Sequence, residues 1–334
     1  MPAPLAPDFR PQYHELHLVG RPGLWRSIVG ALLLLVLVFA IVPLLVGAAF
    51  FAGLVASGRS VDEAAAVLDV TKEATPAGLA LLNVVIAAAI PLTFAVTWWL
   101  HRLKPRWVSS VRPRLRWGYL LACLPLAVAA LLASVGVGLL LPLAPGESPV
   151  GEVNEFTSRT RDFLLVILLL TPLQAAGEEY LFRGYLTQAF GSVRVGRRAA
   201  QTLAVLGPAL IFALFHGLSQ EPPVFFDRFA FGVVAGILVI RTGGLEAAIA
   251  MHVLNNFLAF GLALAFGDLT TALNATGGSS WWMILSTVTQ SLVYLGLATW
   301  VAKAMGVARQ GPPVGGAPLP PAGHPVLDAP PPRV

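Results

Sequence analysis

Eight apolar stretches, each near the roughly twenty residues that a membrane-spanning helix needs, follow one another along the chain. They lie at approximately 28–56, 78–100, 118–143, 163–189, 201–218, 225–240, 245–266 and 281–304. A helix of this length crosses the hydrocarbon core of a bilayer, which is about 30 Å thick. The pattern therefore predicts an all-α, polytopic membrane protein, a bundle of about eight transmembrane helices.

The low content of charged residues supports this fold class. Only 12% of the residues are charged, against about 25% in soluble domains. The formal net charge of +5 lies in short loops between the apolar stretches. We therefore interpret the charge as a signal of topology, and we expect a lipid bilayer around the chain and no nucleic-acid partner.

The distribution of basic residues predicts an orientation. The loop after the second stretch is strongly basic, and other basic residues alternate with acidic or mixed loops along the chain. The basic residues of the loop after the second stretch are Arg102, Lys104, Arg106, Arg112, Arg114 and Arg116. Because cytoplasmic loops carry an excess of Lys and Arg, we expect a multi-pass protein of the cell (plasma) membrane with both termini in the cytoplasm.

The apolar stretches divide the chain into three predicted regions. Residues 1–27 are predicted to be a cytoplasmic N-terminal segment, with a surface helix near 16–25. Residues 28–305 are predicted to form the transmembrane bundle. Residues 306–334 are rich in Pro and Gly and are predicted to be a disordered cytoplasmic tail, because such a composition cannot form a packed core.

Polar side chains inside the spans cluster in the second half of the sequence. An ionisable group there costs at least ~2.5 kcal/mol on insertion scales, and such groups usually mark a function. The candidates are Gln174, Glu178, Glu179 and Arg183 in the fourth span, His216 at the end of the fifth, and His252, Asn255 and Asn256 in the seventh.

Helical spacing divides these candidates into groups. Glu179 and Arg183 are four residues apart and can form an ion pair, which could serve structure alone. Glu178 is turned by about 100° from Glu179 and has no basic partner on its own helix. His252 and Asn256 share a face, although a buried amide can also simply connect two helices by hydrogen bonds.

Together, an unpaired Glu, two His residues and an Asn can hydrolyse an amide. A carboxylate and an imidazole can take a proton from water, and a second imidazole and a carboxamide can stabilise the oxyanion that follows. Glu178, His216 and His252 could alternatively hold Zn²⁺, although no H-E-x-x-H pair is present. A proton-coupled transporter and a non-catalytic membrane scaffold are the competing interpretations.

Three motifs in order resemble a known family. Residues 178–183 match E-E-x-x-x-R, residues 212–216 match F-x-x-x-H, and residues 252–256 match H-x-x-x-N. Over about 160–265 the chain resembles the CPBP family of CAAX proteases and bacteriocin-processing enzymes, also called Abi. The resemblance implies an intramembrane endopeptidase whose catalytic core opens to the cytoplasmic side.

The resemblance also implies roles for the motif residues. Glu178 and His216 would activate the water, His252 and Asn256 would form the oxyanion hole, and Glu179 and Arg183 would support the site. The family has been labelled as metalloproteases, so the cofactor stays open between none and Zn²⁺. The substrate would be a peptide or membrane-anchored protein, prenylated or not. The composition, rich in Ala, Gly and Pro, favours a bacterial role in peptide processing or self-immunity.

Overall fold

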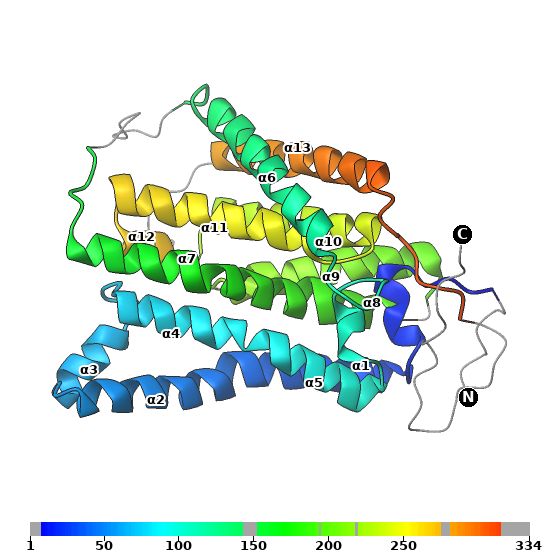
Figure 1. Cartoon of the computed structure of the whole chain (residues 1–334), viewed down its shortest axis with the longest axis horizontal. Helices are drawn as coiled ribbons and strands as arrows, with labels where there is room; N and C mark the ends of the chain where they lie inside the picture. The colour runs from blue at the N-terminus through cyan, green and yellow to red at the C-terminus, as the bar shows by residue number, and fades with distance from the viewer. Residues whose placement is uncertain (1–7, 143–151, 194, 218–219, 275–280, 315–334) are drawn as a thin grey trace.

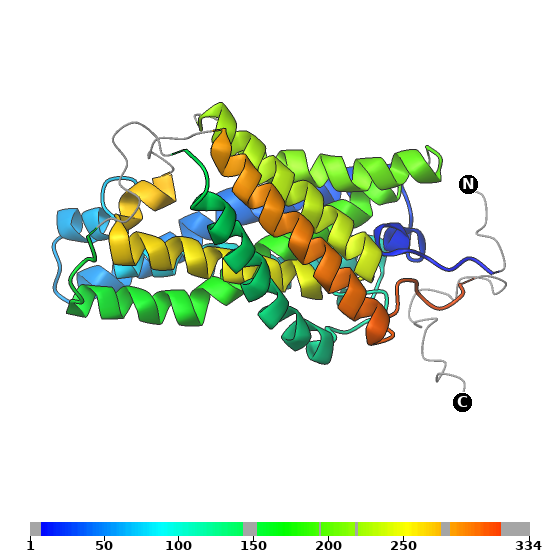
Figure 2. The same ribbon diagram turned by 90° about the horizontal axis from the view of Figure 1, so that it is seen from above.

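The computed structural model describes residues 8–142, 152–193, 195–217, 220–274 and 281–314. Within these ranges, 8 helices are long and apolar enough to cross a membrane, which confirms the predicted fold class. They form an elongated bundle in which α4, α7 and α11 run roughly along the long axis while α6 and α13 cross it obliquely (Figures 1 and 2). The chain is therefore a multi-pass membrane protein.

Several of the spans consist of more than one helical segment. The spans are α1–η2–α2 (Leu24–Val36, Leu37–Ile41, Val42–Ala56), α4–α5 (Pro76–Ala87, Ala89–His101), α6 (Trp117–Gly138), α7–η4–α8 (Ser158–Glu178, Glu179–Leu186, Thr187–Gly191), α9 (Arg197–Phe215), α10 (Pro222–Thr242), α11 (Glu246–Phe266) and α13 (Trp282–Ala304). The segments η2 and η4 are π-helical. Shorter elements are η1 (Tyr13–Leu18), α3 (Val61–Leu68), η3 (Pro105–Val108) and α12 (Leu269–Asn274).

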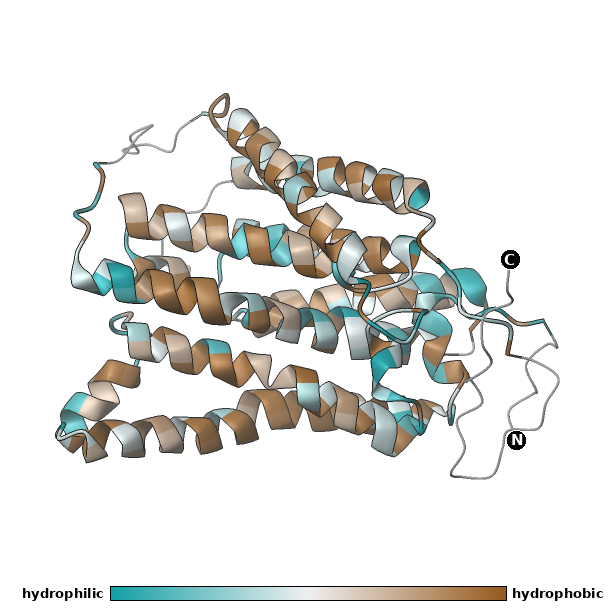
Figure 3. Cartoon of the chain, viewed as in Figure 1, coloured by the Kyte–Doolittle hydropathy of each residue, from teal (hydrophilic) through white to brown (hydrophobic). Residues whose placement is uncertain are grey.

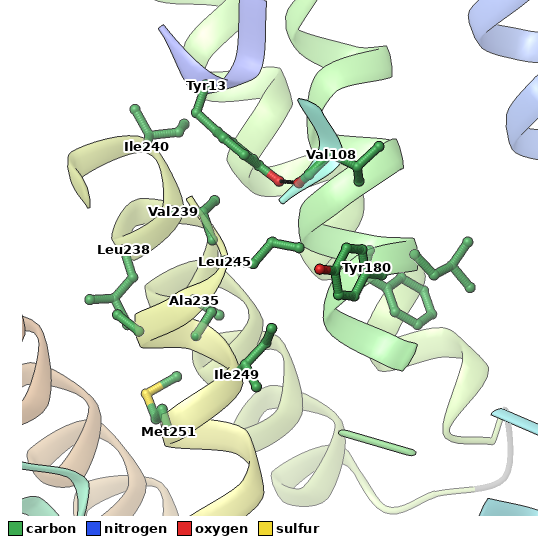
Figure 4. Packing of buried hydrophobic residues seen from close by; sticks show 14 of the residues in the cluster. Tyr13, Val108, Tyr180, Ala235, Leu238, Val239, Ile240, Leu245, Ile249 and Met251 are labelled. Atoms are coloured by element: carbon green, nitrogen blue, oxygen red, sulfur yellow. Dashed lines mark hydrogen bonds between the residues drawn. The ribbon is translucent and has the colours of Figure 1, made fainter. Parts of the chain in front are cut away.

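Apolar side chains lie both inside and outside the bundle, as a bilayer protein requires. Leu44, Leu132 and Leu169 are about two-thirds exposed, on surfaces that face lipid in a membrane. Small and aliphatic residues fill the interior around α10 and α11, including Ala235, Leu238 and Ile249 (Figure 4). Polar residues gather at the two ends of the bundle, while apolar residues dominate the helices between them (Figure 3).

The N-terminal segment packs into the end of the bundle where the described chain both begins and ends. Residues 13–17 of the 3₁₀ helix η1 are buried, so the predicted surface helix at 16–25 is wrong. The hydroxyl of Tyr13 donates to the carbonyl oxygen of Val108 at 2.5 Å (Figure 4). Apolar and imidazole side chains on η1 find partners on η3 and α5, which sequence periodicity alone could not reveal.

The predicted tail starts later than residue 306. Gln310 forms an antiparallel bridge with Gln12, and the amide of Val314 donates to the carbonyl oxygen of Phe9 at 2.9 Å. Residues 306–314 thus pair with the N-terminal segment, because its exposed backbone offers hydrogen-bond partners. The rest of the predicted tail, residues 315–334, lies outside the described residues.

Candidate active site

The fourth span changes its helical geometry at the pair of glutamates. α7 ends at Glu178, and the π-helical segment η4 begins at Glu179 and runs through Arg183. Single π-helical turns within α-helices are frequent at functional sites. All residues of η4 are buried, and Glu179 is fully buried. The wider turn therefore lies where the charged side chains of Glu179 and Arg183 enter the bundle interior.

Glu179 and Arg183 form the ion pair that their spacing predicts. Nη1 of Arg183 lies 3.0 Å from Oε1 of Glu179, and the two side chains are 1% and 0% exposed. The guanidinium carbon of Arg183 lies 4.2 Å from the ring centroid of Phe212 on α9. A cation over an aromatic face is stabilised by the ring's charge distribution. Arg183 thus joins the fourth and fifth spans behind the site.

His252 on α11 lies between the two glutamates. Its Nδ1 is 2.8 Å from Oε1 of Glu179, and its Nε2 is 3.4 Å from Oε2 of Glu178. Sequence spacing predicted that the two carboxylates diverge along their helix, yet both reach the same imidazole. Glu178 therefore has a partner, and that partner comes from another helix.

Two side-chain amides complete this arrangement. Nε2 of Gln174 donates to Oε1 of Glu178 at 2.8 Å, one helical turn away on the predicted shared face. Nδ2 of Asn256 donates to Oε1 of Gln174 at 3.0 Å. Among the described side chains, none donates a hydrogen bond to the buried Oε2 of Glu178. Oε2 of Glu179 has no donor among these side chains either, but of the two glutamates only Glu178 lines the cavity described below.

His216 follows the last residue of α9 and is held by that helix. Its Nδ1 lies 2.8 Å from the carbonyl oxygen of Phe212. A carbonyl can only accept, so Nδ1 carries the proton, and Nε2 of the neutral ring is left as an acceptor. His216 is also more exposed than Glu178 or His252.

A cavity of about 640 Å³ brings the predicted residues together. Gln174, Glu178, His216, His252 and Asn256 all line it, from three different spans. Asn255 lines it too and accepts a hydrogen bond from Gln290 of α13 at 3.3 Å. Glu179 and Arg183 are buried behind these residues. The three motifs therefore meet at one cavity.

The cavity extends away from the termini. Its lining includes Leu68, Val70 and Leu273, which belong to α3, to the connection after it and to α12. These elements lie at the end of the bundle opposite both termini (Figure 1). The sequence predicted that the site opens toward the cytoplasm and that both termini lie in the cytoplasm. Because the cavity extends toward the end of the bundle opposite the termini, only one of these two predictions can hold. At the other end of the bundle, η1 packs against α8. The two backbones approach so closely that a Cβ atom on Gly191 would have no room, and this contact holds η1 in place.

The donors of the alternative zinc site are only partly brought together. Nε2 of His252 lies 3.4 Å from Oε2 of Glu178, and it keeps a lone pair when Nδ1–H donates to Glu179. Within the described ranges, no three His, Cys, Asp or Glu side chains are grouped in a way that could hold a metal ion. The predicted set Glu178, His216 and His252 lines one cavity without forming a ligand sphere.

Two pairs of charged residues in the structure were not predicted from the sequence. Asp227 and Arg228 lie inside the sixth span and line the cavity; two adjacent charges in a span were the available signal. Arg116 and Glu246 form a buried bidentate pair, with Nη2–Oε2 and Nε–Oε1 distances of 2.5 and 2.8 Å. That pair connects the start of α6 to the start of α11, and its residues lie far apart in the sequence.

Comparison with known proteins agrees with the motifs. Residues 160–258 match the family model described as "Type II CAAX prenyl endopeptidase Rce1-like". The chain is also 29% identical over 170 residues to the "Uncharacterized protein YyaK" of Bacillus subtilis (strain 168). That alignment covers 48% of this chain and 56% of the relative, so the chain spans about half the length of the curated relative it matches. No solved structure matches the chain.

The matched segment contains every residue that the three motifs supply, from Glu178 to Asn256. At the level of the family, the match supports a membrane-embedded peptidase that acts on a protein or peptide. The match of residues 160–258 to the Rce1-like family model thus confirms the predicted resemblance to the CAAX protease family.

Proposed function

We propose that this protein is an intramembrane endopeptidase of the CAAX-protease type that hydrolyses a peptide bond with an activated water molecule. The observation that carries the proposal is the convergence of Glu178, His216, His252 and Asn256 on one cavity within the bundle. The family match over the same residues gives the reaction class.

Glu178 and His216 are the proposed general base. Oε2 of Glu178 has no hydrogen-bond donor among the described side chains, and Nε2 of His216 is an acceptor because Nδ1 is bound to Phe212. A water molecule between them would donate a proton to one of these acceptors and attack the carbonyl carbon of the substrate. Gln174 holds the other oxygen of Glu178, and so fixes the direction of the free one.

His252 and Asn256 are the proposed oxyanion hole. A protonated His252 would donate Nδ1–H to Glu179 and present Nε2–H to the cavity, stabilised by the two carboxylates beside it. Asn256 uses one amide hydrogen on Gln174 and keeps a second one to donate. Fixed donors of this kind favour the tetrahedral intermediate over the planar amide.

Glu179 and Arg183 are proposed as positioning residues. Neither lines the cavity, and their pair is fully buried. Glu179 accepts from both Arg183 and His252, so it orients the imidazole while Arg183 compensates its charge. Removal of either partner would leave a buried charge uncompensated, which is strongly destabilising.

The orientation and location remain part of the proposal. With both termini in the cytoplasm of a bacterial cell, the cavity would extend toward the outer face of the cell membrane, because α3 and α12 lie opposite the termini. The substrate would be a peptide or membrane-anchored protein that enters from that side.

The experiment is cleavage of a panel of membrane-anchored fluorogenic peptides by the purified, reconstituted protein. We expect the wild-type protein to cleave at least one peptide, with and without a chelator, and Glu178→Gln to abolish cleavage. A variant of the exposed Glu73, Glu73→Gln, is the matched control and should keep activity. Loss of ion or solute transport in Glu178→Gln, without any peptide cleavage by the wild-type protein, would instead favour the transporter.

A further inference from the structure

A second carboxylate lines the cavity that holds the proposed catalytic residues. Asp227 lies five residues after Pro222, the first residue of α10, and therefore about 7.5 Å along the span from its beginning. Glu178 and Asp227 are the acidic residues among the described residues of that lining. An acidic side chain inside a membrane span is costly and usually marks a function, and the proposed hydrolysis uses only Glu178.

Asp227 lies toward the end of the bundle to which the cavity extends. A Cβ atom on Gly243, the residue after α10, would lie 2.6 Å from the carbonyl oxygen of Ala308 in the C-terminal segment. Because α10 has 21 residues and is about 32 Å long, its beginning lies toward the opposite end. There the rings of Phe226 and Trp281 join the beginnings of α10 and α13, with centroids 5.6 Å apart. A ligand that enters the cavity from this end would meet Asp227 early on its way.

The carboxylate of Asp227 has one partner and one oxygen without a partner. The hydroxyl of Thr287 on α13 donates a hydrogen bond to this carboxylate. Oδ1 of Asp227 is buried and accepts no hydrogen bond from any residue that the structure describes. Buried polar atoms are nearly always hydrogen-bonded, so an unfilled carboxylate oxygen at a cavity indicates a place for a donor. Asp227 thus offers an acceptor to a group that enters the cavity.

The neighbouring Arg228 compensates the charge of Asp227 without filling this oxygen. The two side chains interact electrostatically, and Asp227 has a larger effect on Arg228 than Glu178 has. Successive residues of an α-helix point about 100° apart, and Nη1 of Arg228 donates to Oε1 of Gln220 at 2.6 Å. Arg228 therefore lowers the cost of a carboxylate in the span, and it leaves Oδ1 of Asp227 open to a further donor.

The chemistry of this oxygen limits what the donor can be. An ionised carboxylate only accepts, and its hydrogen bonds to a cation are roughly twice as strong as those to a neutral donor. A guanidinium binds best through both carboxylate oxygens, and Thr287 already donates to this carboxylate. An ammonium group needs only one oxygen. Its aliphatic stem can pack on the apolar part of the cavity wall, which includes Leu81, Leu82 and Phe231.

We propose that Asp227 binds the ammonium group of a lysine side chain in the substrate peptide. This deepens the proposed function and rests on it, because it names a residue that selects among peptides at the same cavity. Asp227 touches the substrate but not the reacting atoms, so it is a specificity-determining residue. Its loss should weaken the binding of peptides with lysine and leave that of peptides without lysine unchanged.

The test measures binding and therefore does not depend on turnover. The probes are dansyl-labelled Val-Leu-Ala-Leu-Ala amides in which Lys, norleucine or Gln replaces each residue in turn. Each peptide is titrated into Glu178→Gln protein in a neutral detergent, where no lipid headgroup attracts the charged peptides, and binding is followed by fluorescence. At one position we expect the Lys peptide to bind about tenfold more tightly than the norleucine and Gln peptides, as a charge-assisted contact implies.

Variants at Asp227 provide the comparison. Adding Asp227→Asn should reduce the Lys-to-norleucine ratio to about one, because Asn keeps the size and can still accept from Thr287 but has no charge. Binding of the norleucine peptide should not change, which shows that the cavity stays intact. Asp227→Glu should keep part of the ratio. Asp162→Asn, at a side chain that is 46% exposed near the beginning of α7, is the matched control and should leave the ratio unchanged.

Several results would overturn the assignment. Equal binding of Lys and norleucine peptides at every position, no binding of any peptide, or a ratio that survives Asp227→Asn would each refute it. A Gln peptide that binds as tightly as the Lys peptide would replace the cation by a neutral donor and refute it as well. The proposed function is judged separately, by whether the wild-type protein cleaves peptides at all. Cleavage of Lys and norleucine peptides with equal efficiency would retain the peptidase and reject the role of Asp227.

Discussion

The imidazole of His252 is bound to Glu179 through an Nδ1–Oε1 distance of 2.8 Å, across two helices that are far apart in the sequence. Glu179 is fully buried and does not line the cavity. We therefore predict that Glu179→Gln lowers the Tm, because Arg183 loses its counter-charge. In the protein that stays folded we predict a kcat lower by roughly two orders of magnitude, as loss of an orienting carboxylate causes elsewhere, while KM changes little. Steady-state kinetics on a fluorogenic peptide measure both. A KM effect with unchanged kcat would contradict the orienting role.

Gln174 links the base to the oxyanion hole, because it donates to Glu178 and accepts from Asn256. We predict that Gln174→Met, which keeps the length of the side chain, lowers kcat about tenfold to a hundredfold with little change in thermal stability. Gln290→Met, which removes a hydrogen bond to Asn255 without touching Glu178, is the comparison variant and should have a smaller effect. Equal losses in the two variants would count against a specific role for Gln174.

The crossing of α4 and α7 depends on the absence of a side chain at residue 177. A Cβ atom on Gly177 would lie 2.3 Å from the carbonyl oxygen of Ile86, so Gly177→Ala must push the helices apart next to Glu178. We predict a Tm lowered by several degrees, because overpacking typically costs about 1–3 kcal/mol, together with reduced kcat. Gly136→Ala in α6, where a Cβ would meet nothing within 4 Å, is the control and should keep both.

Burial of His17 predicts a pH dependence of stability. Burial, together with the nearby His101, lowers the pKa of His17 well below its usual value. The unfolded chain protonates this residue below about pH 6.5, whereas the folded protein does not until a much lower pH. The contribution of neutral His17 to the free energy of unfolding is therefore fully present above about pH 6.5. It decreases as the pH falls below that value, by up to about 1.4 kcal/mol per pH unit.

His17→Phe isolates this contribution. The ring of His17 stacks on that of His101 with centroids 3.8 Å apart, and Phe keeps an aromatic ring there. We expect the Tm of the wild-type protein in detergent to fall more steeply between pH 7 and pH 5 than that of the variant. Parallel curves would show that His17 is not buried in its neutral form.

Cysteine labelling tests the orientation, which the fold alone does not fix. The native Cys123 is fully buried and should not react with a membrane-impermeant maleimide. Arg59→Cys lies in the loop before α3, and Arg198→Cys lies at the opposite end of the bundle; both positions are exposed. On intact cells we predict labelling of Arg59→Cys, and labelling of Arg198→Cys only after lysis. The reverse labelling pattern would mean that the cavity opens toward the cytoplasm.

The sequence predicts the spans well because each is an apolar run of sufficient length, and hydrophobicity alone selects such runs. It also predicts the Glu179–Arg183 pair and the Gln174–Glu178 contact, since both are set by one helical turn. It does not predict that His252 contacts both glutamates, because this requires the π-helical turn and the packing of α11 against α7. The direction of the cavity likewise depends on where η1 packs.

The central claim is that Glu178 and His216 act together on one water molecule. The most direct test compares kcat of Glu178→Gln, His216→Asn and the double variant on one peptide substrate. Residues that act as a unit have strongly non-additive effects, so we predict that each single variant loses at least about a thousandfold and that the double variant loses no more than the worse single one. Losses that multiply, or a His216→Asn variant that retains activity, would contradict the account.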